Sequence, residues 1–254
     1  MPSVNNVQTL GDGQKRVGIE LPDSEYLPTL QAAYRRNLQF WQDEPTDLQI
    51  IVTENEDRFR ELAGPYYDPI IAGVTTDAGL VVFRGMQSLR KEKGGINTWE
   101  GLENGLAHEI GHGYWVKLLR GGMEKTWAPL WVMEGIPTWI GKERWNLARK
   151  DLLAKLAKVY GEWTPDPQAL TWDDMSYIGS GNEKIALSFS LWAEYLKYLT
   201  VETPSTAIQM LRELGPAEWT EAQFNGAFRE TFGKTAVEGL VEFTDYLSSM
   251  QTLR

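Results

Sequence analysis

The sequence predicts an α+β fold: a small N-terminal mixed sheet with helices, then one central helix, then an all-helical C-terminal half. Two observations predict this order. Short apolar runs typical of strands all lie before residue 85, whereas apolar residues recur with helical spacing in most of the chain after Gly122. Between these parts stands the segment His108-Glu109-Ile110-Gly111-His112, the centre of the predicted central helix.

The N-terminal part combines strand patterns with helix patterns. Strands are predicted where apolar residues alternate or run together between turn-forming residues, and helices where they recur every three or four positions. In order, these rules predict a strand at 17–21, a helix at 25–41, a strand at 48–53, a short helix at 56–62, and strands at 70–74 and 80–84 around a turn at 76–79.

The central helix has recognisable ends in the sequence. Asn97 followed by Glu100 resembles a capping box, in which two side chains bond free backbone N–H groups at a helix start. The helix is expected to run to about Leu119 and to end at Gly121-Gly122. Later helices are predicted at 128–141, 142–160, 182–200, 205–214, 220–232 and 235–247, with an ordered loop at 164–180.

Composition limits the classes of protein to consider. The 254 residues are enough to bury a large core, and a hydrophobic content of 42% is ordinary for a globular protein. The net charge of −10 argues against nucleic acid or an anionic membrane surface as a partner. No apolar run is long enough for a membrane span, and the absence of cysteine excludes disulfides and thiolate metal ligands.

His108 and His112 are the only two histidines of the chain. Four residues apart on a helix, they lie on one face, so both imidazoles can bind a single metal ion, of which Zn²⁺ is the usual one. Glu109 points elsewhere and is free to act as a base towards a water molecule on the metal. By composition alone, two histidines fall into this pattern in roughly one chain in two thousand.

A catalytic zinc ion needs a third protein ligand and an open position for water. Because the chain has no further histidine and no cysteine, that ligand must be Asp or Glu. Glu134 is the strongest candidate. Its spacing from His112 suits a second helix that runs back antiparallel to the motif helix, and its neighbours are among the most apolar in the chain. A carboxylate there needs a cation or hydrogen-bond donors. The alternatives are that Glu134 is a surface residue, or that Glu124 or Glu143 is the ligand.

The two motifs together carry a family resemblance. His-Glu-x-x-His followed at 131–139 by Trp-Val-Met-Glu-Gly-Ile-Pro-Thr-Trp resembles the gluzincin metallopeptidases, specifically the peptidase MA-like group, whose second motif looks like Trp-Leu-x-Glu-Gly-Leu-Ala. The order of predicted elements before the motif helix is also similar, as is Phe228–Gly233 with the helix that follows. The resemblance covers about residues 25–247 and is specific at the two motifs.

This resemblance implies a zincin-like fold with Zn²⁺ as the cofactor. Carried onto this chain, it implies His108, His112 and Glu134 as zinc ligands and Glu109 as the general base. We therefore expect two subdomains that form one catalytic unit. Residues 1–122 form an α/β zincin subdomain with the zinc helix, and residues 123–254 form a helical subdomain that carries the third ligand.

Further residues are predicted to assist the site. Tyr177, in a Gly-rich loop, is our choice for the donor that stabilises an oxyanion, although an ordinary loop aromatic is an equally good interpretation. Asn104 and Thr138 are candidates for orienting the metal ligands. The strand at 80–84 either provides a sheet edge to which an extended peptide adds or lies inside the sheet.

The sequence thus predicts a zinc-dependent metallopeptidase that acts on a peptide or protein substrate. One alternative is a non-catalytic zinc-binding or interaction module on a peptidase-like scaffold, against which the intact Glu109 argues; another is hydrolysis of an amide or ester in a non-peptide substrate such as a cell-wall fragment. Residues 1–6 lack the features of a signal peptide. The sequence does not predict a localisation: the protein is secreted or in the cell envelope if a signal peptide was removed, and cytoplasmic otherwise. The sequence predicts neither an oligomeric state nor a choice between endo- and exopeptidase.

Overall fold

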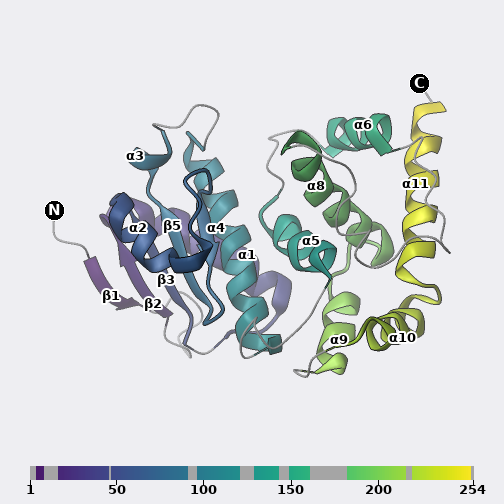
Figure 1. Cartoon of the computed structure of the whole chain (residues 1–254), viewed down its shortest axis with the longest axis horizontal. Coiled ribbons are helices and arrows are strands. Elements are labelled where there is room, and N and C mark those ends of the chain that lie inside the picture. Colours follow the sequence, from purple (N-terminus) through teal and green to yellow (C-terminus); the bar gives the residue numbers. More distant parts are fainter. Residues whose placement is uncertain are drawn as a thin grey trace. The chain divides into compact units, whose positions relative to one another are not determined.

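A computed structural model describes residues 4–8, 17–45, 47–90, 96–120, 129–142, 149–160, 182–215 and 219–252 (Figure 1). Contacts divide the chain into two compact units, Met1–Thr126 with Ile140–Lys142 and Trp127–Trp139 with Glu143–Arg254. Over the described ranges, all strands belong to the first unit and the second is helical, which confirms the predicted α+β organisation. None of the helices within these ranges is both long and apolar enough to cross a membrane.

The first unit is built on a five-stranded mixed sheet with the order β1-β2-β3-β5-β4. Strands β2, β3 and β5 are parallel, whereas β1 and β4 pair antiparallel to their neighbours. The strands are β1 (Val4–Gln8), β2 (Val17–Leu21), β3 (Gln49–Thr53), β4 (Gly73–Thr75) and β5 (Leu80–Arg84). The elements between them are η1 (Ser24–Tyr26), α1 (Leu27–Trp41), α2 (Glu56–Ala63) and η2 (Gly64–Tyr66).

One strand prediction needs correction, and the structure decides between the two positions left open for the strand at 80–84. The strand predicted at 70–74 begins only at Gly73, because the Ile70 N–H donates to the Asp68 side chain (2.9 Å) and Arg84 Nη1 donates to the Pro69 carbonyl (2.8 Å), which holds a turn there. Strand β5 is interior, since it lies between β3 and β4, so β4 forms that edge of the sheet. The sequence patterns also do not predict β1, whose residues Val-Asn-Asn-Val-Gln are mostly polar.

Different helices cover the two faces of strand β5. Val82 packs with Phe59 and Ala63 of α2 on one face. Val81 and Phe83 point to the other face, where they meet glycines of helix α4 (Trp99–Tyr114). Helix α1 packs beside α4 (Figure 1). The sheet and α1 therefore support the helix that carries the histidines.

Helix α4 begins one residue later than predicted. Thr98, not Asn97, is the N-cap, and its hydroxyl accepts a hydrogen bond from the Gly101 N–H (3.0 Å). The helix passes through both histidines and continues as the π-helical segment η3 (Trp115–Arg120), close to the predicted length. The predicted end at Gly121-Gly122 lies outside the described residues. A short helix, α3 (Met86–Leu89), follows β5.

The second unit has an aromatic core. Trp131 packs against Tyr195, Phe224 and Phe228 with ring centroids 5.5, 6.0 and 6.2 Å away. Its helices are α5 (Leu130–Ile140), α6 (Arg149–Tyr160), α8 (Asn182–Leu199), α9 (Ser205–Leu214), α10 (Glu221–Phe232) and α11 (Ala236–Thr252). All six correspond to predicted helices, although α6 begins at Arg149 and residues 143–148, like the predicted loop at 164–180, lie outside the described part.

Candidate metal centre

Helix α4 carries two adjacent rows of side chains, because residues four apart lie on the same face of a helix. One row contains His108 and His112, and the other contains Glu109 with Gly105 one turn before it. A Cβ atom at Gly105 would lie 2.6 Å from Phe83 Cζ, so only glycine fits there without displacing that ring. The second row therefore lies close against the sheet, while the histidines present a different face.

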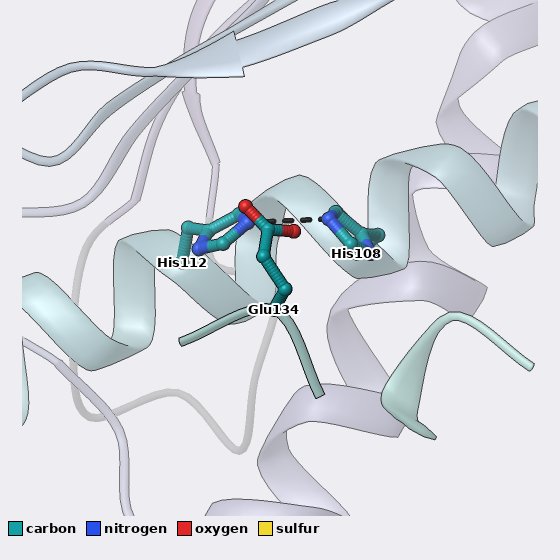
Figure 2. Close-up of side chains that lie close together, drawn as sticks. All are labelled: His108, His112 and Glu134. Carbon is teal, nitrogen blue, oxygen red and sulfur yellow. Dashed lines mark hydrogen bonds between the residues drawn. The ribbon is translucent and has the colours of Figure 1, made fainter. Parts of the chain in front are cut away.

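The two imidazole rings converge through their Nε2 atoms. These atoms lie 3.2 Å apart, and the rings are inclined by 73° with centroids 4.9 Å apart (Figure 2). His108 is buried, with 7% of its surface exposed, and His112 is half-buried. The predicted spacing on one helix thus brings the two histidines together.

Glu134 lies on helix α5, where its neighbours Trp131, Val132 and Ile136 are buried. Glu134 itself is partly buried. One ligand atom from each of Glu134, His108 and His112 can be chosen so that all lie within 4.8 Å of one another (Figure 2). The structure thereby brings together the three residues that the sequence predicts as metal ligands.

The donor atoms of this group fit a zinc ion. Two nitrogen ligands of a tetrahedral zinc ion, each about 2.05 Å from it, are separated by about 3.3 Å. The Nε2 atoms of His108 and His112 are 3.2 Å apart, and the Glu134 carboxylate adds an oxygen ligand. Without a metal, the same separation is a hydrogen bond between a protonated and an unprotonated Nε2. Two nitrogens and one carboxylate form the ligand set of one class of catalytic zinc site.

Glu109 approaches the edge strand β4. The Thr75 hydroxyl lies 3.1 Å from Glu109 Oε2 and 2.8 Å from the backbone carbonyl oxygen of Glu109. A Cβ atom at Gly73 would lie 2.9 Å from Glu109 Cγ, so the glutamate side chain passes directly over this glycine. The general base predicted from the sequence is therefore held against the sheet edge, on the helix row beside the histidines.

Side chains of α1 support helix α4 around the first histidine. Arg36 of α1 forms an ion pair with Glu103, and its Nη1 donates to Asn104 Oδ1 (2.8 Å). Within the part of the chain that the structure describes, Asn104 thus links α4 to α1 and not to a metal ligand, contrary to its predicted role. The cause is the position of Arg36, which faces Asn104 one turn before His108.

Several predicted residues are not tested by this geometry. Tyr177, the predicted oxyanion donor, lies outside the described residues, as do the alternative ligands Glu124 and Glu143. Thr138 is buried on α5. Its orienting role stays a prediction.

The sequence reasoning missed Gly73 and Thr75. Their alternation with Val74 indicates that they share one face of a strand, and this signal was available in the sequence. What the sequence does not contain is the order of the strands, which makes β4 the edge and places it beside Glu109.

Comparisons with known proteins concern the fold. No protein-family model matches the chain, and no curated protein matches it. Among solved structures, a mutant of the M1 zinc metallopeptidase from Deinococcus radiodurans is similar over 96% of this chain and 51% of its own, with 13% sequence identity and a TM-score of 0.51. This chain thus spans about half the length of that protein. The likeness shows that the fold is of the kind found in that zinc metallopeptidase.

Proposed function

We propose that this protein is a zinc-dependent metallopeptidase that hydrolyses peptide bonds, with His108, His112 and Glu134 as zinc ligands and Glu109 as the general base. The observation that carries the proposal is the convergence of the three ligand atoms within 4.8 Å, with Glu109 on the next row of the same helix. A structural zinc site needs no such glutamate, because its ligands fill all positions. The similarity in fold to a zinc metallopeptidase supports the same assignment.

The chemistry divides between the metal and the residues of the chain. A bound Zn²⁺ lowers the pKa of water and polarises a carbonyl group. Glu109 accepts a proton from the attacking water at a carboxylate oxygen and later delivers it to the nitrogen of the leaving amine. Tyr177 remains our proposed donor to the oxyanion.

The outer edge of strand β4 is the proposed binding surface for an extended peptide. The Arg84 N–H donates to the Ala72 carbonyl (2.8 Å), and the Thr76 N–H donates to the Leu80 carbonyl (2.9 Å), so these positions bond to β5. Since bonding direction alternates along an antiparallel pair, the backbone groups of Gly73 and Thr75 point away from β5. A substrate strand can add there beside Glu109.

The direct test is the substitution Glu109→Gln. The variant should keep the zinc content of the wild type and lose hydrolysis of a broad peptide library by at least about a hundredfold, because glutamine cannot accept the proton. Glu100→Gln, at an exposed position in the first turn of the same helix, is the matched control and should retain activity.

Each outcome distinguishes between the functions considered. A wild-type protein that binds zinc and cleaves no peptide in the library would favour the non-catalytic zinc module. Cleavage of peptidoglycan fragments without cleavage of peptides would favour the non-peptide hydrolase. Full peptidase activity in Glu109→Gln would remove Glu109 from the mechanism.

A further inference from the structure

Thr75 makes two contacts with one residue of helix α4. Its Oγ1 lies 2.8 Å from the backbone carbonyl oxygen of Glu109 and 3.1 Å from Glu109 Oε2. Thr75 is 5% exposed, so water competes little for its hydroxyl group. The hydroxyl has one proton and faces two acceptors, both on Glu109, so it donates to both as one shared, three-centre hydrogen bond. The contact therefore joins the edge strand to the backbone and the side chain of the same glutamate.

The neighbouring glycine makes this contact possible. In a strand, alternate residues share a face, so Gly73 and Thr75 both point towards α4, while Val74 packs with the α2 cluster on the other face. The Glu109 side chain passes over Gly73, where a Cβ atom would lie 2.9 Å from its Cγ. The stem of the glutamate thus lies over one strand position and its carboxylate group reaches the next residue on that face.

We propose that Thr75 is a positioning residue for the reaction: its hydroxyl holds the Glu109 carboxylate in one orientation against strand β4. This inference rests on the proposed peptidase function. A free glutamate side chain has several rotamers of similar energy, and a general base works only from the one that reaches the water. Threonine suits the task, because its β-branched side chain has few rotamers and keeps the hydroxyl near both acceptor oxygens of Glu109.

The same residue couples substrate and base. The backbone of Thr75 points to the open edge, where a peptide would bond, whereas its side chain contacts Glu109. Loss of the hydroxyl therefore leaves the peptide-binding backbone of β4 in place and removes the two contacts to Glu109, one to its carboxylate and one to its backbone carbonyl. The expected signature is a change in kcat with little change in KM.

The experiment compares Thr75→Val, which keeps the shape and removes the hydroxyl, with Thr75→Ser, which keeps the hydroxyl. In the zinc-loaded full chain, Thr75→Val should lower kcat by about ten- to a hundredfold with KM within about threefold of the wild type. Thr75→Ser should restore most of the rate, and zinc content should not change in either variant. Thr53→Val is the matched control, because Thr53 is a buried strand threonine whose hydroxyl bonds the Asn55 N–H (3.1 Å), and its kcat should stay at the wild-type value.

Crystal structures of the wild type and the two variants provide a readout that does not depend on activity. The Glu109 carboxylate should occupy one position in the wild type and in Thr75→Ser, and a displaced or divided position in Thr75→Val. An unchanged carboxylate and an unchanged kcat in Thr75→Val would overturn the inference while the peptidase function stands. A loss of kcat that Thr75→Ser does not restore would also overturn it. If the wild type cleaves no peptide, the proposed function fails, and the position of Glu109 in the three structures still decides whether Thr75 holds it.

Discussion

The side-chain amide of Asn37 donates a hydrogen bond to the backbone carbonyl of Ala107, 2.9 Å away and one residue before His108. The same nitrogen donates to the Ala33 carbonyl within α1 (3.1 Å), so two carbonyl acceptors fix the orientation of the amide group. Asn37 is fully buried. It joins α1 to α4 at the level of the first proposed ligand, and it adds a polar anchor to the apolar packing between these helices.

This contact predicts a loss of stability in Asn37→Leu, which keeps a similar volume and removes the donor. We expect the free energy of unfolding to fall by about 1–3 kcal/mol, since the variant loses a fully buried hydrogen bond between two helices. Urea unfolding followed by circular dichroism measures the change. Asn97→Ala, at an exposed position before α4, is the control and should change the stability by less than about 0.5 kcal/mol. An equal effect of the two substitutions would contradict the role of Asn37.

Gly73→Ala tests how closely Glu109 approaches the edge strand. The new Cβ atom would lie 2.2 Å from Phe83 Cδ2 and 2.9 Å from Glu109 Cγ, so one of these side chains must move. We expect a loss of about 1–3 kcal/mol in the free energy of unfolding and a lower peptidase rate with unchanged zinc content. Gly226→Ala, in helix α10 with nothing within 4 Å of its new Cβ atom, is the control. Gly226→Ala should raise the free energy of unfolding by up to about 1 kcal/mol. If Gly73→Ala raised it as well, Glu109 would not approach strand β4 as closely as the structure indicates.

Stability should fall at alkaline pH, and two buried tyrosines contribute to the fall. Burial raises the pKa of Tyr34 on α1 and of Tyr114 on α4 above the ordinary value of 10.0. Above pH 10, the unfolded chain loses these protons while the folded protein keeps them, so ionisation favours unfolding. Their contribution is thus fully present below pH 10 and is lost as the pH rises towards the folded-state pKa values.

Urea unfolding at a series of pH values measures this dependence. Up to about pH 10, the two tyrosines should have little effect on the free energy of unfolding. Above that pH, each of them should lower it by about 1.4 kcal/mol per pH unit. The double variant Tyr34→Phe/Tyr114→Phe should reduce the slope, whereas Tyr246→Phe, a residue that is 41% exposed, should not. The same slope in the wild type and both variants would show that Tyr34 and Tyr114 do not contribute to the loss of stability at alkaline pH.

The sequence predicted what depends on local pattern. The spacing of His108 and His112 on a helix and the apolar surroundings of Glu134 were sufficient to select three residues that the structure brings together. The start of helix α4 was predicted within one residue, because capping residues signal a helix end. Thr98 is the N-cap instead of Asn97, since the Thr98 hydroxyl accepts a hydrogen bond from the Gly101 N–H.

What the sequence could not supply depends on long-range pairing. Strand β5 carries a strong strand pattern, whereas β4 has three residues, and only the pairing order shows that the weaker strand is the edge. The contact between Thr75 and Glu109 follows from that order and from the close packing that Gly105 allows. Asn104 was assigned from the sequence to the metal ligands instead of to Arg36. Arg36 lies 68 residues earlier in the chain, so its hydrogen bond with Asn104 cannot be inferred from spacing.

Zinc stoichiometry tests the central claim most directly. After dialysis against metal-free buffer and loading with Zn²⁺, the wild-type protein should hold close to one zinc ion per chain, as measured by mass spectrometry of the metal. His112→Ala should hold almost none, Glu134→Gln should bind at least about tenfold more weakly, and Glu100→Gln should match the wild type. A wild-type protein without bound zinc, or a His112→Ala variant with undiminished zinc, would contradict the proposed metal centre.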